Sequence, residues 1–157
     1  MITIDFGNMP AADINLLIEN IISYENGVFV FDGPTASGKT SLLNLILEKK
    51  NSVRKFSDEQ FVEIIIKEFK EGRSAECIIG NVTMSLNEYE IIAVEEIDML
   101  WGRPYTLGII AEIINKVSKN HLVIFTGISI EERVPELIKK LESAKFVYFK
   151  REEEREN

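Results

Sequence analysis

The stretch VFVFDGPTASGKTS, residues 28–41, contains the most specific pattern in this sequence of 157 residues. An apolar run leads into G-x-x-x-x-G-K-T, from Gly33 to Thr40, and the residues that follow continue as a helix. This is a complete Walker A pattern in the strand–loop–helix context that the motif requires. The alternative interpretation is a glycine turn that binds no ligand.

The residue types in this loop fit the chemistry of phosphate binding. Gly33 and Gly38 allow the backbone to curl, so that successive N–H groups converge on phosphate oxygens at a helix N-terminus. Lys39 is expected to neutralise the β and γ phosphates, and the Thr40 hydroxyl to bind Mg²⁺. We therefore predict a site for ATP or ADP with Mg²⁺. Its predicted nucleotide-binding residues are Gly33, Pro34, Thr35, Ala36, Ser37, Gly38, Lys39, Thr40 and Ser41.

Composition limits the other classes of function. A chain of 157 residues with 45% hydrophobic and 28% charged residues is typical of one globular domain, here expected over residues 1–157 with an acidic tail at 151–157. The net charge of −8 argues against strong direct DNA binding, and no apolar run is long enough for a membrane span. The N-terminus lacks a secretory signal pattern, so we expect a cytoplasmic protein. Cys77 is expected to be a small buried hydrophobe.

Apolar patterns predict alternating strands and helices. Five strands are expected, over residues 28–32, 53–56, 91–95, 122–126 and 146–149. Helices are expected between Pro10 and Gly27, over residues 38–50, from Ser57 to about Gly72, over residues 107–117 and from Ser129 onward. Ser57 with Gln60 and Ser129 with Glu132 are predicted capping boxes. Residues 76–88 are read as one or two short strands or a loop excursion.

Strands joined by helices of this length require parallel pairing with right-handed crossovers. The expected fold is a three-layer α/β/α sandwich around a five-stranded parallel sheet of the P-loop NTPase class. Ligands of such sheets bind beyond the carboxyl ends of the strands. The glycine loop, the acids after residue 94 and Thr126 all fall at that edge.

The segment IIAVEEID, residues 91–98, is a candidate Walker B strand. In this arrangement one acid lies near Mg²⁺ and the next lies near the attacking water. Glu95 is the candidate metal ligand, and Glu96 is the candidate general base. Thr126 is a candidate catalytic residue whose hydroxyl could reach the γ-phosphate. The alternatives are a solvent-exposed acidic strand end and a threonine that satisfies the backbone at a strand end. His121 and Trp101 are expected to have structural roles.

Five segments follow one another in the chain: VFVFDGPTASGKTSLLNLI, VRKFSDEQFVEII, EYEIIAVEEIDMLWG, HLVIFTGIS and LESAKFVYF. Their order resembles the nucleotide-binding core of the DnaA-type AAA+ ATPases, the bacterial replication initiators and their regulatory paralogues. The resemblance covers nearly the whole chain, although only the Walker A match is strict. It implies that Glu95 and Glu96 form the Walker B pair and that Thr126 stands at or beside the first sensor.

The departures from that family concern hydrolysis. Glu95 stands where the family usually has an aspartate, and Lys145 stands where it carries an arginine finger. Because the sequence ends at Asn157, we expect the helical lid and the DNA-binding domain of the initiators to be missing. An arginine finger is worth about 10³ to 10⁵ in rate, so the resemblance implies weak or no ATP hydrolysis. If the protein is an enzyme, we expect a slow Mg²⁺-dependent ATPase.

Three functions remain open from the sequence. The first is an ATP-binding, DnaA-like protein with a regulatory or accessory role in DNA replication, acting with another AAA+ subunit or a replication protein. The second is a small P-loop transferase, because GPTASGKT is also a spelling typical of tRNA dimethylallyltransferases, or a small kinase. The third is a non-enzymatic interaction module with a P-loop fold.

Overall fold

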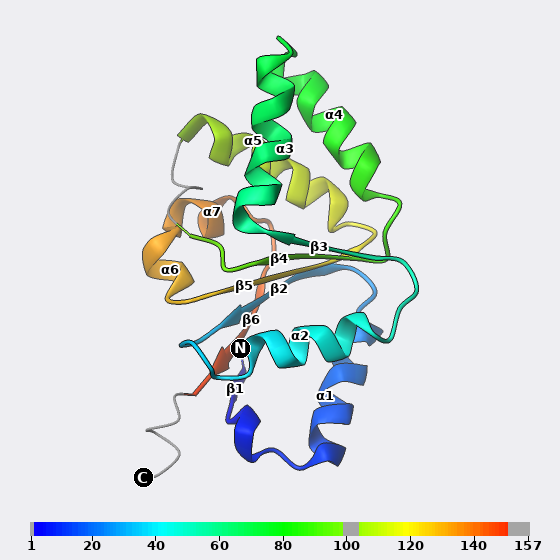
Figure 1. The fold of residues 1–157 in the computed structure, drawn as a ribbon, viewed down its shortest axis with the longest axis vertical. Helices are drawn as coiled ribbons and strands as arrows, with labels where there is room; N and C mark the ends of the chain where they lie inside the picture. Colours follow the sequence, from blue (N-terminus) through cyan, green and yellow to red (C-terminus); the bar gives the residue numbers. More distant parts are fainter. Residues whose placement is uncertain (1, 99–103, 151–157) are drawn as a thin grey trace.

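The computed structural model describes residues 2–98 and 104–150 and contains one parallel sheet between two layers of helices (Figure 1). The strands are β1 (Ile2–Ile4), β2 (Gly27–Asp32), β3 (Val53–Ser57), β4 (Ile91–Glu95), β5 (Leu122–Gly127) and β6 (Lys145–Phe149). Their order across the sheet is β1-β6-β2-β5-β4-β3, and every neighbouring pair is parallel. The predicted α/β class and parallel pairing are confirmed.

The predicted count of five strands is wrong, because the described sheet has six. The additional strand, β1, pairs with β6 from Ile2 opposite Val147 to Ile4 opposite Phe149. Only three residues long, β1 is too short to show the alternation or apolar run by which a strand is recognised in sequence. It extends the sheet beyond β6.

Helices cover both faces of the sheet (Figure 1). They are α1 (Ala11–Ser23), α2 (Lys39–Leu47), α3 (Asp58–Lys70), α4 (Ala75–Leu86), α5 (Pro104–Val117), α6 (Ile130–Arg133) and α7 (Pro135–Lys140), with a short 3-10 helix, η1, at Phe6–Asn8. Helices α1 and α2 pack on one face around Ile18, Leu42 and Phe31. On the other face, α3, α4, α5 and the α6–α7 segment pack around Phe61, Ile110 and Phe125. None of the described helices is long and apolar enough to cross a membrane.

Most of residues 76–88 form a helix, which the sequence did not predict. Helix α4 replaces the short strands or loop predicted over residues 76–88. Ser74 caps it by accepting a hydrogen bond from the Cys77 N–H, and Ile78, Val82 and Leu86 form a buried stripe at four-residue spacing. Helix α4 packs against α5, and Cys77 lies outside the buried stripe. Its predicted burial is wrong, because Cys77 is exposed.

The two predicted capping boxes have opposite outcomes. At Ser57, both reciprocal hydrogen bonds with Gln60 are present, and the box is confirmed. At Ser129, the backbone is left-handed with φ of 49° and the side chain makes no capping bond, so that box is wrong. The single helix predicted there is broken at Val134, since Pro135 disfavours helical geometry in the residue before it.

Candidate nucleotide-binding site

The Walker A loop connects the carboxyl end of β2 to the first turn of α2. Ala36 and Gly38 adopt positive φ angles of 62° and 104°, which curl the chain before Lys39 begins the helix. The loop encloses a pocket of about 210 Å³, lined by residues 35–41 and Glu96. A pocket of this size suits phosphate groups, and its position at a helix N-terminus favours negative charge.

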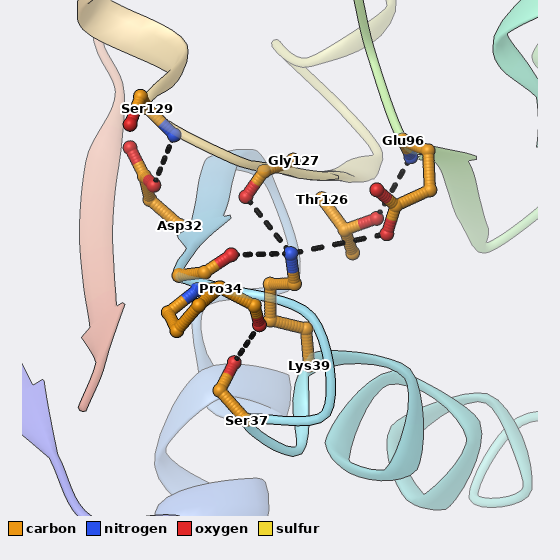
Figure 2. Close-up of polar contacts among 9 residues, drawn as sticks. Asp32, Pro34, Ser37, Lys39, Glu96, Thr126, Gly127 and Ser129 are labelled. Carbon is orange, nitrogen blue, oxygen red and sulfur yellow. Dashed lines mark hydrogen bonds and ion pairs between the residues drawn. The ribbon is translucent and has the colours of Figure 1, made fainter. Parts of the chain in front are cut away.

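The Lys39 side chain lies at the centre of this site (Figure 2). Its Nζ donates hydrogen bonds to the carbonyl oxygens of Gly33, at 2.5 Å, and Gly127, at 3.1 Å, and lies 3.8 Å from Glu96 Oε1. Lys39 is only 4% exposed. Burial lowers the pKa of its ammonium group, opposed by the charges of Glu96 and Asp32. A phosphate would therefore give this cation a stronger partner than the carbonyl groups do.

Glu96 and Thr126 are brought together by neighbouring strands (Figure 2). The backbone N–H of Glu96 donates a hydrogen bond to Thr126 Oγ1 at 3.0 Å, and Thr126 is fully buried. Glu96 has a positive φ of 54°, and its side chain, 59% exposed, lies beside Lys39. The Thr126 hydroxyl thus holds the backbone at a strand end, which is the role the sequence offered as the alternative to phosphate contact.

Glu95 ends β4 beside a second lysine that the sequence did not single out. Its Oε2 lies 3.8 Å from Lys55 Nζ, whereas its Oε1 is buried and has no hydrogen-bond partner among the described residues. A carboxylate oxygen in that state fits a hard cation, and carboxylate and hydroxyl oxygens are the ligands that Mg²⁺ takes. Glu95 and Thr40 are therefore the residues that could hold the metal.

Asp32 is a further residue that sequence reasoning missed. Its carboxylate accepts a hydrogen bond from the backbone N–H of Ser129 at 2.9 Å (Figure 2). It accepts another from the backbone N–H of Ile130 at 3.0 Å. Within the loop, the Ser37 hydroxyl donates to the Pro34 carbonyl oxygen at 2.6 Å. Asp32 therefore links the strand before the Walker A loop to the segment after β5. An acid at the end of an otherwise apolar strand was the only signal of this role.

The N-terminal segment closes one side of the loop. A Cβ atom built on Gly38 would lie 2.4 Å from Phe6 Cδ2, so the Phe6 ring of η1 packs directly against this glycine. Any side chain at this position would collide with that ring. The requirement for glycine at Gly38 thus has two causes, its positive φ and the proximity of Phe6.

The remaining candidates lie elsewhere or outside the described residues. His121 precedes β5 at the amino end of the sheet, away from the loop, and its structural role stays a prediction. Lys145 begins β6, and its Nζ lies 4.7 Å from the centre of the Tyr24 ring. Trp101 and the tail at residues 151–157 fall outside the described residues.

Comparison with known proteins shows similarity only in structure. No protein-family model matches the chain, and no curated protein matches it. A DNA replication initiation factor superposes with a TM-score of 0.65 at 15% identity, over 91% of this chain and 48% of that one. Domain III of DnaA from Thermotoga maritima superposes with a TM-score of 0.63 at 13% identity, over 90% of this chain and 64% of that one. DnaA from Aquifex aeolicus, bound to AMPPCP, superposes with a TM-score of 0.63 at 18% identity, over 88% of this chain and 45% of that one.

The chain has the same fold as these DnaA structures. C. elegans PCH-2 also matches it, with a TM-score of 0.51 at 16% identity. The chain spans about half of the length of most of these structures, and about two thirds of DnaA domain III. Within this fold, the Walker A loop and both candidate Walker B acids lie at the carboxyl edge of the sheet, where nucleotide sites of open α/β folds form.

Proposed function

We propose that this chain binds ATP or ADP with Mg²⁺ through residues 33–41, as a single P-loop domain. One observation carries the proposal: the complete Walker A sequence forms a curled loop at a helix N-terminus, with the buried ammonium group of Lys39 at its centre. The fold shared with DnaA bound to AMPPCP supports it. The bound metal would offset phosphate charge, and Glu95 and Thr40 would hold it.

We further propose a DnaA-like regulatory or accessory role in DNA replication, in the cytoplasm and with a second AAA+ subunit or a replication protein as partner. The order of segments and the fold shared with replication initiators support this role. The net charge of −8 favours a protein partner over direct contact with DNA. A pull-down in ATP and in ADP tests this role, and partners captured equally with either nucleotide would contradict it.

In this proposal hydrolysis is slow or absent. Glu96 is placed beside Lys39 as a candidate base, with Thr126 holding its backbone. Lys145, at the position of the family's arginine finger, is engaged with Tyr24 at the amino end of β6 and lacks the planar fork that an arginine offers to a phosphate. Glu96 would then contribute little to turnover by the isolated chain.

Isothermal titration calorimetry with ATP and ADP, in magnesium and in EDTA, tests nucleotide binding. Lys39→Ala should abolish binding, because the pocket then lacks its buried cation. Lys116→Met is the matched control, since it removes an exposed lysine at the far end of α5. Binding that survives in Lys39→Ala, or its absence from the unmodified protein, would overturn the proposal.

A further inference from the structure

A second lysine lies within reach of the candidate metal ligand, on the neighbouring strand. Strands β3 and β4 are paired so that Ser57 stands opposite Glu95, and Lys55 is two residues before Ser57, on the same face of the sheet. From there its Nζ comes within 3.8 Å of Glu95 Oε2. The strand register therefore creates this pair.

The same ammonium group also contacts the helix that carries the Walker A residues. Lys55 Nζ donates a hydrogen bond to Asn44 Oδ1 at 3.2 Å. Asn44 is four residues after Thr40 in α2, so both residues lie on one side of that helix. Lys55 thus bridges the element that supplies one candidate metal ligand and the strand that supplies the other.

The exposure and the partners of the Glu95 carboxylate indicate how Lys55 affects the approach of a cation. Lys55 is 40% exposed and Glu95 is 22% exposed, so solvent screens the pair only in part. Glu95 Oε1 is buried and lacks a hydrogen-bond partner among the described residues, so Lys55 is the only described cation beside this carboxylate. A divalent cation that approaches Glu95 must displace the ammonium group or accept its repulsion.

We propose that Lys55 is a positioning residue that acts as an internal counter-ion of Glu95 and competes with Mg²⁺ for it. This inference rests on the proposed function. Lys55 stabilises Glu95 in the absence of metal and lowers the gain in nucleotide affinity that magnesium provides. When the metal occupies the site, the Lys55 ammonium moves away from Glu95 and keeps Asn44 Oδ1 as its hydrogen-bond acceptor.

The test is the ratio of the ADP dissociation constant in EDTA to that in saturating magnesium, measured by calorimetry. Lys55→Met keeps the length of the side chain and removes its charge, so this ratio should rise about fivefold, the effect of one partly exposed ion pair. Lys55→Gln should behave in the same way. Lys116→Met removes a remote charge and should leave the ratio unchanged.

A second pair of variants assigns the effect to Glu95. In a Glu95→Gln background the carboxylate is neutral, so Lys55→Met should no longer change the ratio. An unchanged ratio in Lys55→Met would overturn the inference while nucleotide binding stands. Equal weakening of ADP binding in EDTA and in magnesium would also overturn it, and would assign Lys55 to the phosphates. If the unmodified protein binds no ADP in either condition, the proposed function itself fails.

Discussion

The backbone N–H of Glu96 donates a hydrogen bond to the buried hydroxyl of Thr126, thirty residues later in the chain. The Thr126 carbonyl oxygen in turn accepts from the N–H of Ile97, at 2.9 Å. One residue of β5 therefore fixes two successive residues after β4, including the one with positive φ. The position of the candidate base depends on this contact between strands.

Thr126→Val should lower the free energy of unfolding by about 1–3 kcal/mol, because it leaves the N–H of Glu96 without its acceptor. Urea denaturation measures this change. Thr83→Val is a matched control, since the Thr83 hydroxyl is buried without a partner among the described residues, and its removal should be neutral or stabilising. Equal costs for the two substitutions would show that the contact with Glu96 contributes nothing.

Asp32→Ala should destabilise the protein by about 2–4 kcal/mol, because two N–H groups lose a charged acceptor in a buried position. Asp32→Asn keeps one acceptor oxygen and should cost less. Amide hydrogen exchange should accelerate at Ser129 and Ile130 in particular. Asp13→Ala, an exposed acid in the first turn of α1, serves as the control, with an expected cost below about 1 kcal/mol. Unchanged exchange at both amides would contradict the role of Asp32.

Gly38→Ala should cost more stability than Gly27→Ala, although the two glycines have nearly equal φ angles of 104° and 106°. Backbone strain alone accounts for about 1–3 kcal/mol at Gly27, where a Cβ would meet no atom within 4 Å. At Gly38 the collision of the alanine Cβ with the Phe6 ring adds to this cost. Phe6→Ala in the Gly38→Ala background should recover the difference in urea denaturation. Equal costs at the two glycines would exclude the steric contribution of Phe6.

Asp58→Asn should flatten the dependence of stability on pH. Burial, together with the nearby charges of Asp98 and Glu59, raises the pKa of the Asp58 carboxyl to about 7. A carboxyl whose pKa is higher in the folded state favours folding when protonated, so this contribution is lost as the pH rises from about 4 to above 7. Thermal unfolding should therefore show a smaller decrease from pH 5 to pH 8 in Asp58→Asn than in Glu63→Gln, which removes an exposed acid of the same helix. Parallel curves of melting temperature against pH for the two variants would contradict this role of Asp58.

Much of the sheet could be predicted from sequence because its central strands are continuous apolar runs. The segments at residues 28–32, 91–95 and 122–126 are buried on both faces, and the Walker A loop follows from its own local pattern. Helix α4 could not be predicted in the same way. It contains Gly80, Val82 and Thr83, which lower helix propensity, and its N-cap lacks the acidic partner of a capping box.

The parts of the candidate site that escaped prediction are contacts across the sheet. The partners of Asp32 lie 97 and 98 residues later, and the Lys55–Glu95 pair depends on the register of two strands. Neither relationship leaves a local signal. Lys39, Glu96 and Thr126 were singled out by their motifs, and the structure places them in contact, while their roles toward a nucleotide stay predictions.

The pairing of β1 with β6 also has a mechanical consequence. These two strands are adjacent and parallel, so the chain enters the sheet at Ile2 and leaves it after Phe149 at opposite ends of one ladder. A pulling force applied between these two points would load the hydrogen bonds of the ladder in shear, all at once, rather than peeling them apart one by one. The three-residue edge strand β1 would then keep the Phe6 ring against the loop until all hydrogen bonds of the ladder break together.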